Sequence, residues 1–177
     1  IQSAIDGASD SYCIVVMDGS YSENIVINKS IRLASEEGPS NCTITAANSS
    51  LDVIKISSDN VTVDGLGLKG ANADYFVCGV QLTSGRYCTI TNCIISDCSE
   101  GVYAHQSGDI VIANNIILNI SNYGILFMSA VNADIYGNVL DNASIGISSW
   151  GGGSNSAKIR NNTITGCTDG IHCSGST

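Results

Sequence analysis

The stretch Gly101-Val102-Tyr103-Ala104 decides the fold, because it returns as Gly124-Ile125-Leu126-Phe127 one repeat later. In both copies a glycine precedes a branched apolar residue, and the following residues alternate in the frame of a short β-strand. The pattern opens at five glycines, which are separated by 22, 23, 22 and 24 residues: Gly79, Gly101, Gly124, Gly146 and Gly170. A fixed period of this length indicates a solenoid in which each repeat forms one coil.

A second alternating run follows each of the three middle glycines. It reads Ile112, Asn115, Ile117, then Ile135, Asn138, Leu140, then Ile159, Asn162, Ile164. Strands this short cannot bury a face alone, so the coils must stack strand on strand at ~4.8 Å. The sequence therefore predicts an all-β fold, a right-handed parallel β-helix of about seven coils. The three asparagines fall at equivalent turns, where stacked amides form a hydrogen-bonded ladder: Asn115, Asn138 and Asn162.

The two ends of the predicted solenoid differ. An apolar stripe with helical spacing (Ile1, Ala4, Ile5, Ala8) predicts a short helix that caps the first coil and hides its edge. At the other end, Asp169–Cys173 opens a further strand with no cap after it. We expect one β-helix domain over residues 1–177, with a capping helix at 1–12, longer coils at 13–75 and regular coils at 76–177.

Composition excludes several classes of function. The net charge is −9 and only seven residues are Lys or Arg, so the chain lacks the basic surface that nucleic acid or anionic lipid requires. No apolar run reaches the ~18 residues of a membrane span, so we expect no direct membrane insertion. Charged residues make up 13% of the chain, too few for a disordered chain or for charged helices.

The first 70 residues carry a resemblance to a known superfamily. The residues concerned are Ile1–Ile5, Val15–Glu23, Ile25–Ile31 and Val61–Gly65. They resemble extracellular parallel β-helix repeat proteins of the pectin lyase-like superfamily, as found in envelope proteins of methanogenic archaea. The resemblance implies an extracellular, cell-envelope or cell-surface location. It also includes a Gly-x-Tyr-x-Glu element at Gly19, Tyr21 and Glu23 that is similar to one in pectinesterases, and that we expect to shape a turn.

Alternate residues after each glycine are expected to point outward in two columns. One column reads Lys55, Gln81, Tyr103, Leu126, Ser148, His172, and the other reads Ser57, Thr83, His105, Met128, Trp150, Ser174. Their middle members would form an exposed patch for a ligand or a partner: Tyr103, His105, Leu126, Met128 and Trp150. Three interpretations remain open at this point, namely a protein interface, a platform for sugar rings, or a core covered by a loop such as 150–155.

Eight cysteines are many for this length, and none forms a Cys-x-x-Cys pair. Most fall at inward positions, where a free cysteine acts as a small apolar filler. Cys13 and Cys42 both precede short strands that we align one coil apart, so they are the candidate disulfide.

Seven Asn-x-Ser/Thr sequons are candidate glycosylation sites, which agrees with an envelope location. They begin at Asn28, Asn41, Asn48, Asn60, Asn119, Asn142 and Asn161.

Our first functional hypothesis is a non-catalytic structural protein of a cell envelope, sheath or surface layer. It would associate through its open end and its outward face, with copies of itself or with neighbouring envelope proteins. The alternative is a carbohydrate-binding module or a polysaccharide lyase- or hydrolase-like enzyme, with Tyr103, His105 and Arg86 as the groups for chemistry. We expect no cofactor and no metal, since a third reading, copper handling, lacks a His-rich or Met-rich cluster.

Overall fold

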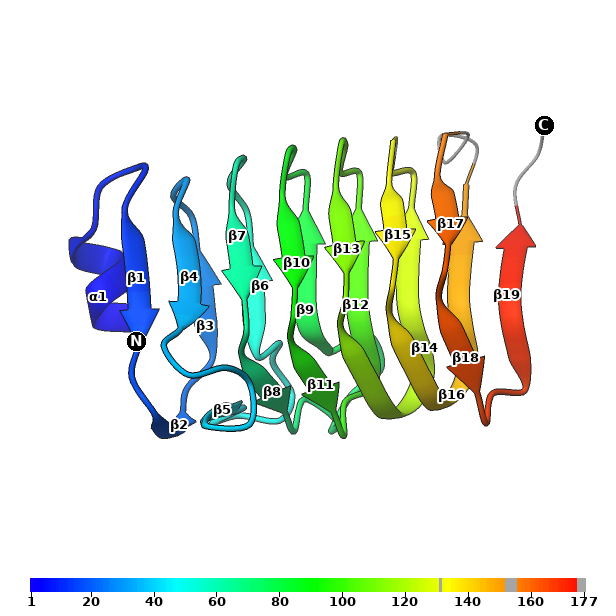
Figure 1. The fold of residues 1–177 in the computed structure, drawn as a ribbon, viewed down its shortest axis with the longest axis horizontal. Coiled ribbons are helices and arrows are strands. Elements are labelled where there is room, and N and C mark those ends of the chain that lie inside the picture. Colours follow the sequence, from blue (N-terminus) through cyan, green and yellow to red (C-terminus); the bar gives the residue numbers. More distant parts are fainter. Residues whose placement is uncertain (131, 152–155, 175–177) are drawn as a thin grey trace.

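The computed structural model describes residues 1–130, 132–151 and 156–174. Among these, every strand pair is parallel, and the chain forms a β-helix in which each coil stacks on the one before (Figure 1). This confirms the predicted fold class. The solenoid begins with helix α1 (Gln2–Gly7), which lies across the first coil. None of the described helices is long and apolar enough to cross a membrane.

The first face of the solenoid is a seven-stranded sheet with one strand from each coil. Its strands are β1 (Cys13–Val16), β4 (Arg32–Ser35), β7 (Thr62–Asp64), β10 (Thr89–Thr91), β13 (Val111–Ala113), β15 (Asp134–Tyr136) and β17 (Lys158–Arg160). Strands of three or four residues are short because each coil must turn a corner at both ends of the strand.

A twelve-stranded sheet forms the other two faces. The second face contains β2 (Gly19–Ser22), β5 (Cys42–Thr45), β8 (Gly67–Lys69), β11 (Ile94–Ser96) and β18 (Thr163–Thr165). The third face contains β3 (Ile25–Ile27), β6 (Ile54–Ile56), β9 (Cys78–Thr83), β12 (Glu100–His105) and β19 (Asp169–Ser174). Two long strands, β14 (Ile116–Met128) and β16 (Val139–Trp150), run through the corner and join these faces.

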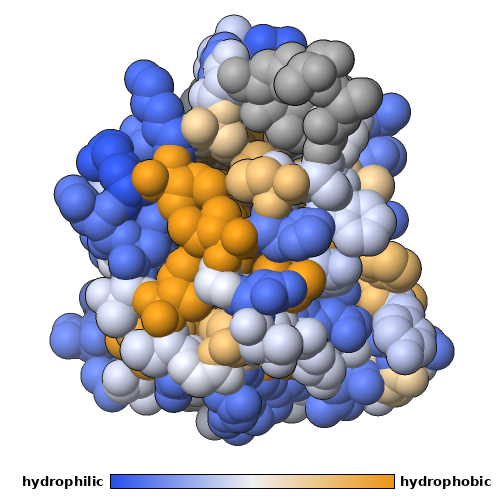
Figure 2. All heavy atoms as spheres, turned by 90° about the vertical axis from the view of Figure 1, so that its right-hand side faces the viewer, coloured by the Kyte–Doolittle hydropathy of each residue, from blue (hydrophilic) through white to orange (hydrophobic). Residues whose placement is uncertain are grey.

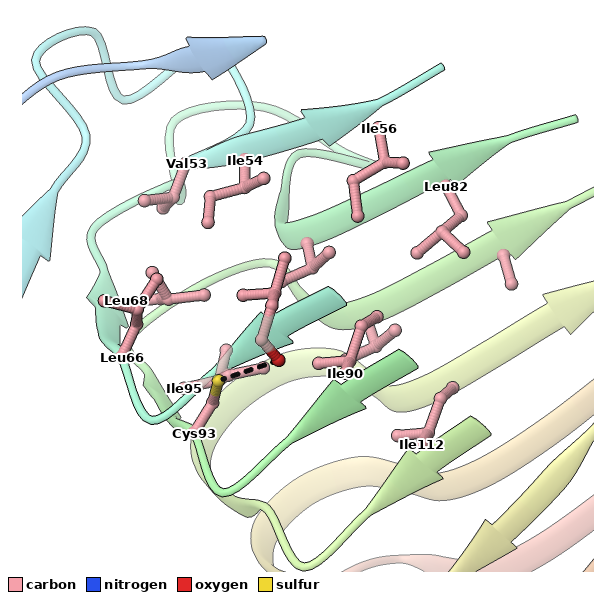
Figure 3. Packing of buried hydrophobic residues seen from close by; sticks show 14 of the residues in the cluster. Val53, Ile54, Ile56, Leu66, Leu68, Leu82, Ile90, Cys93, Ile95 and Ile112 are labelled. Carbon is pink, nitrogen blue, oxygen red and sulfur yellow. Dashed lines mark hydrogen bonds between the residues drawn. The ribbon is translucent and has the colours of Figure 1, made fainter. Parts of the chain in front are cut away.

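The core fills the space between the three faces. Side chains from all of them point into one apolar cluster, and the labelled residues of Figure 3 are 1% exposed or less. Alternation along each strand produces this arrangement, since residues at even spacing face the same side. Among the described side chains, no buried nitrogen or oxygen atom lacks a hydrogen-bond partner.

The Asn ladder satisfies one column of buried turns. Asn115 Nδ2 donates to Asn138 Oδ1 at 3.0 Å, and Asn138 Nδ2 donates to Asn162 Oδ1 at 2.9 Å. Each amide oxygen also accepts from a backbone N–H of the preceding coil, at 3.0 Å from Cys93 to Asn115. These bonds link residues 22, 23 and 24 positions apart, which is the repeat length in the regular part of the chain.

Candidate functional site

The third face carries the two outward columns, and the strand register aligns them as the glycine frame predicts. Gln81, Tyr103, Leu126 and Ser148 are successive register partners from β9 to β16. Thr83, His105, Met128 and Trp150 form the neighbouring column. The two columns therefore bring together side chains that lie up to about seventy positions apart in the chain.

The expectation that the whole patch is exposed is wrong for its middle. Leu126 is 1% exposed and Ser148 is fully buried, although both stand on the outer side of the sheet. The indole of Trp150 folds back over this column and donates its Nε1–H to Ser148 Oγ at 2.9 Å. Trp150 itself is 40% exposed, and Tyr103, His105 and Met128 are half-buried. The expected cover from residues 152–155 lies outside the described residues.

Two aromatic residues that the sequence analysis did not assign complete the patch. Tyr123 packs its ring edge against Trp150 with 6.1 Å between centroids, and Phe76 lies 6.3 Å from Tyr103. Tyr103 in turn stacks on His105 at 6.0 Å and donates its hydroxyl to Met128 Sδ at 3.4 Å. We call this cluster the aromatic patch: Phe76, Tyr103, His105, Tyr123, Leu126, Met128 and Trp150.

The aromatic patch encloses a small apolar pocket and adjoins a polar groove. The pocket has a volume of about 80 Å³ and is lined by Phe76, Tyr123, Leu126, Met128 and Trp150. The groove has a volume of about 380 Å³ and is lined by Asn72, Ala73, Asp74, Tyr75, Ser99, Ser121 and Asn122. Both are bordered by the segment 72–76 and by the corner at residues 121–123, so aromatic rings and hydrogen-bonding groups lie side by side.

A buried carboxylate holds this corner in place. Glu100 is fully buried at the start of β12, and its Oε2 accepts from the backbone N–H of Tyr123 at 3.1 Å. Its Oε1 accepts from Asn122 Nδ2 at 3.4 Å. Burial raises the pKa of Glu100 to about 7, and these two hydrogen bonds oppose the rise. The carboxylate therefore holds the main chain at Tyr123, whose ring belongs to the aromatic patch.

Glu100 belongs to a column of titratable groups at the corner. Its register partner is Cys78, whose backbone N–H donates to Asp52 Oδ1 at 2.9 Å. Burial, followed by the nearby Asp52 and Glu100 carboxylates, raises the pKa of the Cys78 thiol well above its usual value. Sequence reasoning missed this column, although Glu100 occupies the position before the glycine where Cys78 and Ile145 stand in other coils.

Arg86, the third residue predicted to carry chemistry, is engaged elsewhere. Arg86 forms an ion pair with Asp109 at 2.7 Å and lies over the ring of Tyr87 at 5.5 Å, so its guanidinium is held at the turn before the first face. His172 lies on β19, three strands from His105 on β12.

The predicted disulfide between Cys13 and Cys42 is wrong. Cys13 lies on the first face opposite Arg32, whereas Cys42 lies on the second face opposite Gly19. The two cysteines therefore belong to different sheets, and all eight cysteines are free thiols. The error arose because the strands that follow them look alike in sequence but are not equivalent in the coil.

Comparison with known proteins places these features in context. A protein of Methanothermus fervidus named cell surface glycoprotein is 33% identical over 110 residues, which cover 61% of this chain and 17% of that protein. Among solved structures, Geobacillus virus E2 ORF18 has a TM-score of 0.73 and 19% identity over 94% of this chain and 37% of its own. An alginate lyase from Paenibacillus sp. has a TM-score of 0.66 and 18% identity, over 92% of this chain and 72% of that enzyme. At such identities these structures support the fold alone.

A family model described as periplasmic copper-binding protein (NosD) matches residues 6–177. Copper is bound in proteins by His, Met and Cys ligands. Within the described part of the chain, no group of three or more His, Cys, Asp or Glu residues could hold a metal ion. His105 and Met128 are register partners, but Met128 Sδ already accepts a hydrogen bond from the Tyr103 hydroxyl. The described residues therefore do not fit a resident copper ion.

The family match and the surface glycoprotein agree on where the chain resides. Both support an extracellular or cell-surface location, as the resemblance to pectin lyase-like envelope proteins implied. The chain spans 17% of the length of the curated relative, so the activity of a whole protein does not transfer to it. Because the NosD family model matches residues 6–177, nearly all of the chain, the chain belongs to the NosD family of parallel β-helix proteins.

Proposed function

We propose that the chain is a non-catalytic structural segment of a cell-surface solenoid, and that it associates with a second copy through the open edge of its last coil. A change in burial at this end carries the proposal. Ile147 is fully buried, whereas its register partner Ile171, one coil on, is 52% exposed. Figure 2 looks onto this end of the molecule, where a hydrophobic area is exposed beside more polar residues on its left and below.

The inward side chains of the last coil are less buried than their partners in the coil before it. Ile159 and Ile164 are half-buried, although their partners one coil earlier, Ile135 and Leu140, are fully buried. Strands β17, β18 and β19 pair with another described strand on one side only. An open edge of this kind accepts a further strand, and full burial of each isoleucine stabilises the contact by about 1.5–3 kcal/mol.

The opposite end of the solenoid is closed. Ile5 of α1 is fully buried, and Lys29 Nζ donates to the carbonyl oxygens of Ile5, Asp6 and Ala8 at 3.0, 2.6 and 2.7 Å. A head-to-tail stack would have to displace this helix. Two open ends can instead meet about a two-fold axis, so we expect a closed dimer rather than a filament.

Analytical ultracentrifugation over a wide concentration range tests the proposal. The unaltered chain should form a dimer, and Ile171→Asp should shift it to monomer because it places a charge in the contact. The matched control is Val26→Asp, since Val26 is 44% exposed on β3 near the closed end. A chain that stays monomeric at every concentration would overturn self-association and leave the open edge to further coils of a longer polypeptide.

A second candidate function is glycan binding at the aromatic patch. The observation that favours it is the apolar pocket beside Trp150 and Tyr123, which adjoins the polar groove at Asn72–Tyr75. Aromatic faces stack on sugar rings while polar groups receive the hydroxyls. A pectin methylesterase solved in complex with a hexasaccharide has the same fold, with a TM-score of 0.60 at 14% identity, over 93% of this chain and 61% of that one.

A glycan array followed by calorimetry tests this second function. Trp150→Ala should lower the affinity for any glycan that binds, because it removes one wall of the pocket. Tyr87→Ala is the matched control, since Tyr87 is 56% exposed at the turn before the first face and lies outside the patch. Absence of binding across the array would remove this candidate.

A further inference from the structure

The seven sequons differ in how the fold holds their backbones. All seven acceptor asparagines are exposed, so exposure does not distinguish them. A transferase must reach the acceptor nitrogen and the third residue together, and it cannot do so where the N–H of that third residue is already bonded to a neighbouring coil. The hydrogen bond made by the N–H of the third sequon residue therefore separates the sites that an enzyme can use from those that it cannot.

Asn48 lies in the loop between β5 and β6, and its side chain accepts a hydrogen bond from within its own sequon. The N–H of Ser50 donates to Asn48 Oδ1 at 3.0 Å, which forms an Asx turn. No group in the described chain accepts a hydrogen bond from Asn48 Nδ2. The amide nitrogen that would receive a glycan is thus available at the surface.

The fold holds this loop in position without covering it. Asn24 Oδ1 accepts from the Asn48 N–H at 2.8 Å, and Asn24 Nδ2 donates to the Asn48 carbonyl oxygen at 3.1 Å. On the other side, the N–H of Ala73 donates to the carbonyl of Ser49 at 3.0 Å. The Asx turn is therefore clamped through its main chain while the Asn48 side chain stays exposed.

The other six sequons are bonded into the solenoid. Four third-residue N–H groups donate to other parts of the chain, namely Ser30 to Asp10, Thr62 to Ile31, Ser121 to Cys98 and Thr163 to Asn138. The remaining two third residues, Thr43 and Ser144, lie inside β5 and β16.

At two of these sequons the amide nitrogen is also engaged. Asn142 Nδ2 donates to Asn119 Oδ1 at 3.0 Å, and Asn119 Nδ2 donates to Asp97 Oδ1 at 3.4 Å. These side chains form an outer ladder along the corner. A glycan on either nitrogen would have to break that ladder.

We propose that Asn48 is the residue at which the folded chain is N-glycosylated. The co-substrate is a saccharide carried on a polyprenyl pyrophosphate. Asn48 Nδ2 forms a bond to the anomeric carbon, the bond from that carbon to the pyrophosphate oxygen breaks, and the nitrogen gives up one proton as the pyrophosphate leaves. This site depends on the surface location of the chain and is independent of both self-association and the aromatic patch.

Glycosylation in vitro tests the proposal. The folded chain is incubated with a single-subunit oligosaccharyltransferase and a polyprenyl-pyrophosphate-linked oligosaccharide, and the modified residues are mapped by mass spectrometry. Asn48→Gln should abolish the main modification. Ser50→Ala should do the same while keeping the Asx turn, because the backbone N–H remains. Asn60→Gln is the matched control and should leave incorporation unchanged, since the Thr62 N–H is bonded to Ile31.

Short peptides that carry each sequon serve as the unrestrained comparison, and we expect several of them to be modified. Circular dichroism of each variant shows that the β-helix is retained. The proposal is overturned if the folded chain carries no glycan at Asn48, or if Asn60, Asn119 or Asn142 is modified to the same extent as Asn48.

Discussion

At the residue scale, Glu100 makes the stability of the molecule depend on pH. Its pKa in the folded chain, about 7, lies above the ordinary value of 4.5, so the native state retains a proton that the unfolded state releases. The stabilisation is fully present below pH 4.5 and is lost as pH rises through about 7. Ionising this buried group costs on the order of 3 kcal/mol.

We therefore predict that Glu100→Gln flattens the pH dependence of unfolding between these values. Glutamine can still accept the Tyr123 N–H bond but carries no charge to bury. Urea denaturation at a series of pH values measures the free energy of unfolding, with Glu37→Gln as the control because Glu37 is exposed. An unchanged slope in Glu100→Gln would show that Glu100 is not the group responsible.

The thiols are a second residue-scale property. Cys13 and Cys173 are exposed, whereas Cys42, Cys78, Cys88, Cys93 and Cys98 are buried. Burial raises the pKa of Cys93 to about 12 and that of Cys98 to about 11, so both stay protonated and unreactive in the folded chain.

We predict that a thiol reagent without reductant modifies Cys13 and Cys173 rapidly in the native chain, and all eight cysteines in denaturant. Mass spectrometry of the labelled peptides identifies each site. Any cysteine that remains unlabelled in denaturant would reveal a disulfide and contradict the assignment of free thiols.

At the scale of the element, four of the recurring glycines set how closely consecutive coils approach on the third face, namely Gly79, Gly101, Gly124 and Gly146. A Cβ added at Gly124 would lie 2.6 Å from the carbonyl oxygen of Gly146 and 2.5 Å from Leu140 Cδ2. One of these atoms belongs to the backbone and cannot move without shifting the next coil. The glycine pattern that identifies the repeat is therefore a packing requirement.

Gly124→Ala should lower the free energy of unfolding by about 1–3 kcal/mol, the usual cost of overpacking. Gly7→Ala is the control, because a Cβ at the end of α1 would have nothing within 4 Å. Denaturant melts of the two variants measure the difference. Equal stability of Gly124→Ala and the unaltered chain would contradict the close approach of these coils.

At the scale of the whole molecule, α1 closes one end of an otherwise extendable structure. Strands β1, β2 and β3 each pair with one strand of the next coil, so their outer edges depend on the helix for cover. Deleting residues 1–8 should open these edges and permit head-to-tail stacking. We predict assemblies much larger than a dimer, visible as rods by electron microscopy.

The same deletion combined with Ile171→Asp should abolish the rods, because stacking needs both ends. Rods that persist in the double variant would place the contact on an outward face of the solenoid instead. The unaltered chain, with α1 in place, is the reference for size.

The sequence alone predicted the β-helix, its outward columns and the equivalence of the three ladder asparagines. Each of these features depends on a local repeat. The glycine spacing and the alternation of apolar and polar residues recur along the chain, so equivalent positions can be aligned from the sequence. The extracellular or cell-surface location was implied by the resemblance that the first 70 residues carry, and the comparisons confirm it.

Only the tertiary structure decided what covers or joins the repeats. The burial of Leu126, the positions of Phe76 and Tyr123, and the carboxylate of Glu100 at the corner depend on loops and turns that break the period. The separation of Cys13 from Cys42 depends on which strands the irregular first coils place on each face. A residue at a periodic position has the same surroundings in every coil, so its environment can be inferred from the equivalent residue one repeat away. The residues named above instead contact groups that are distant in sequence and that occur in only one coil.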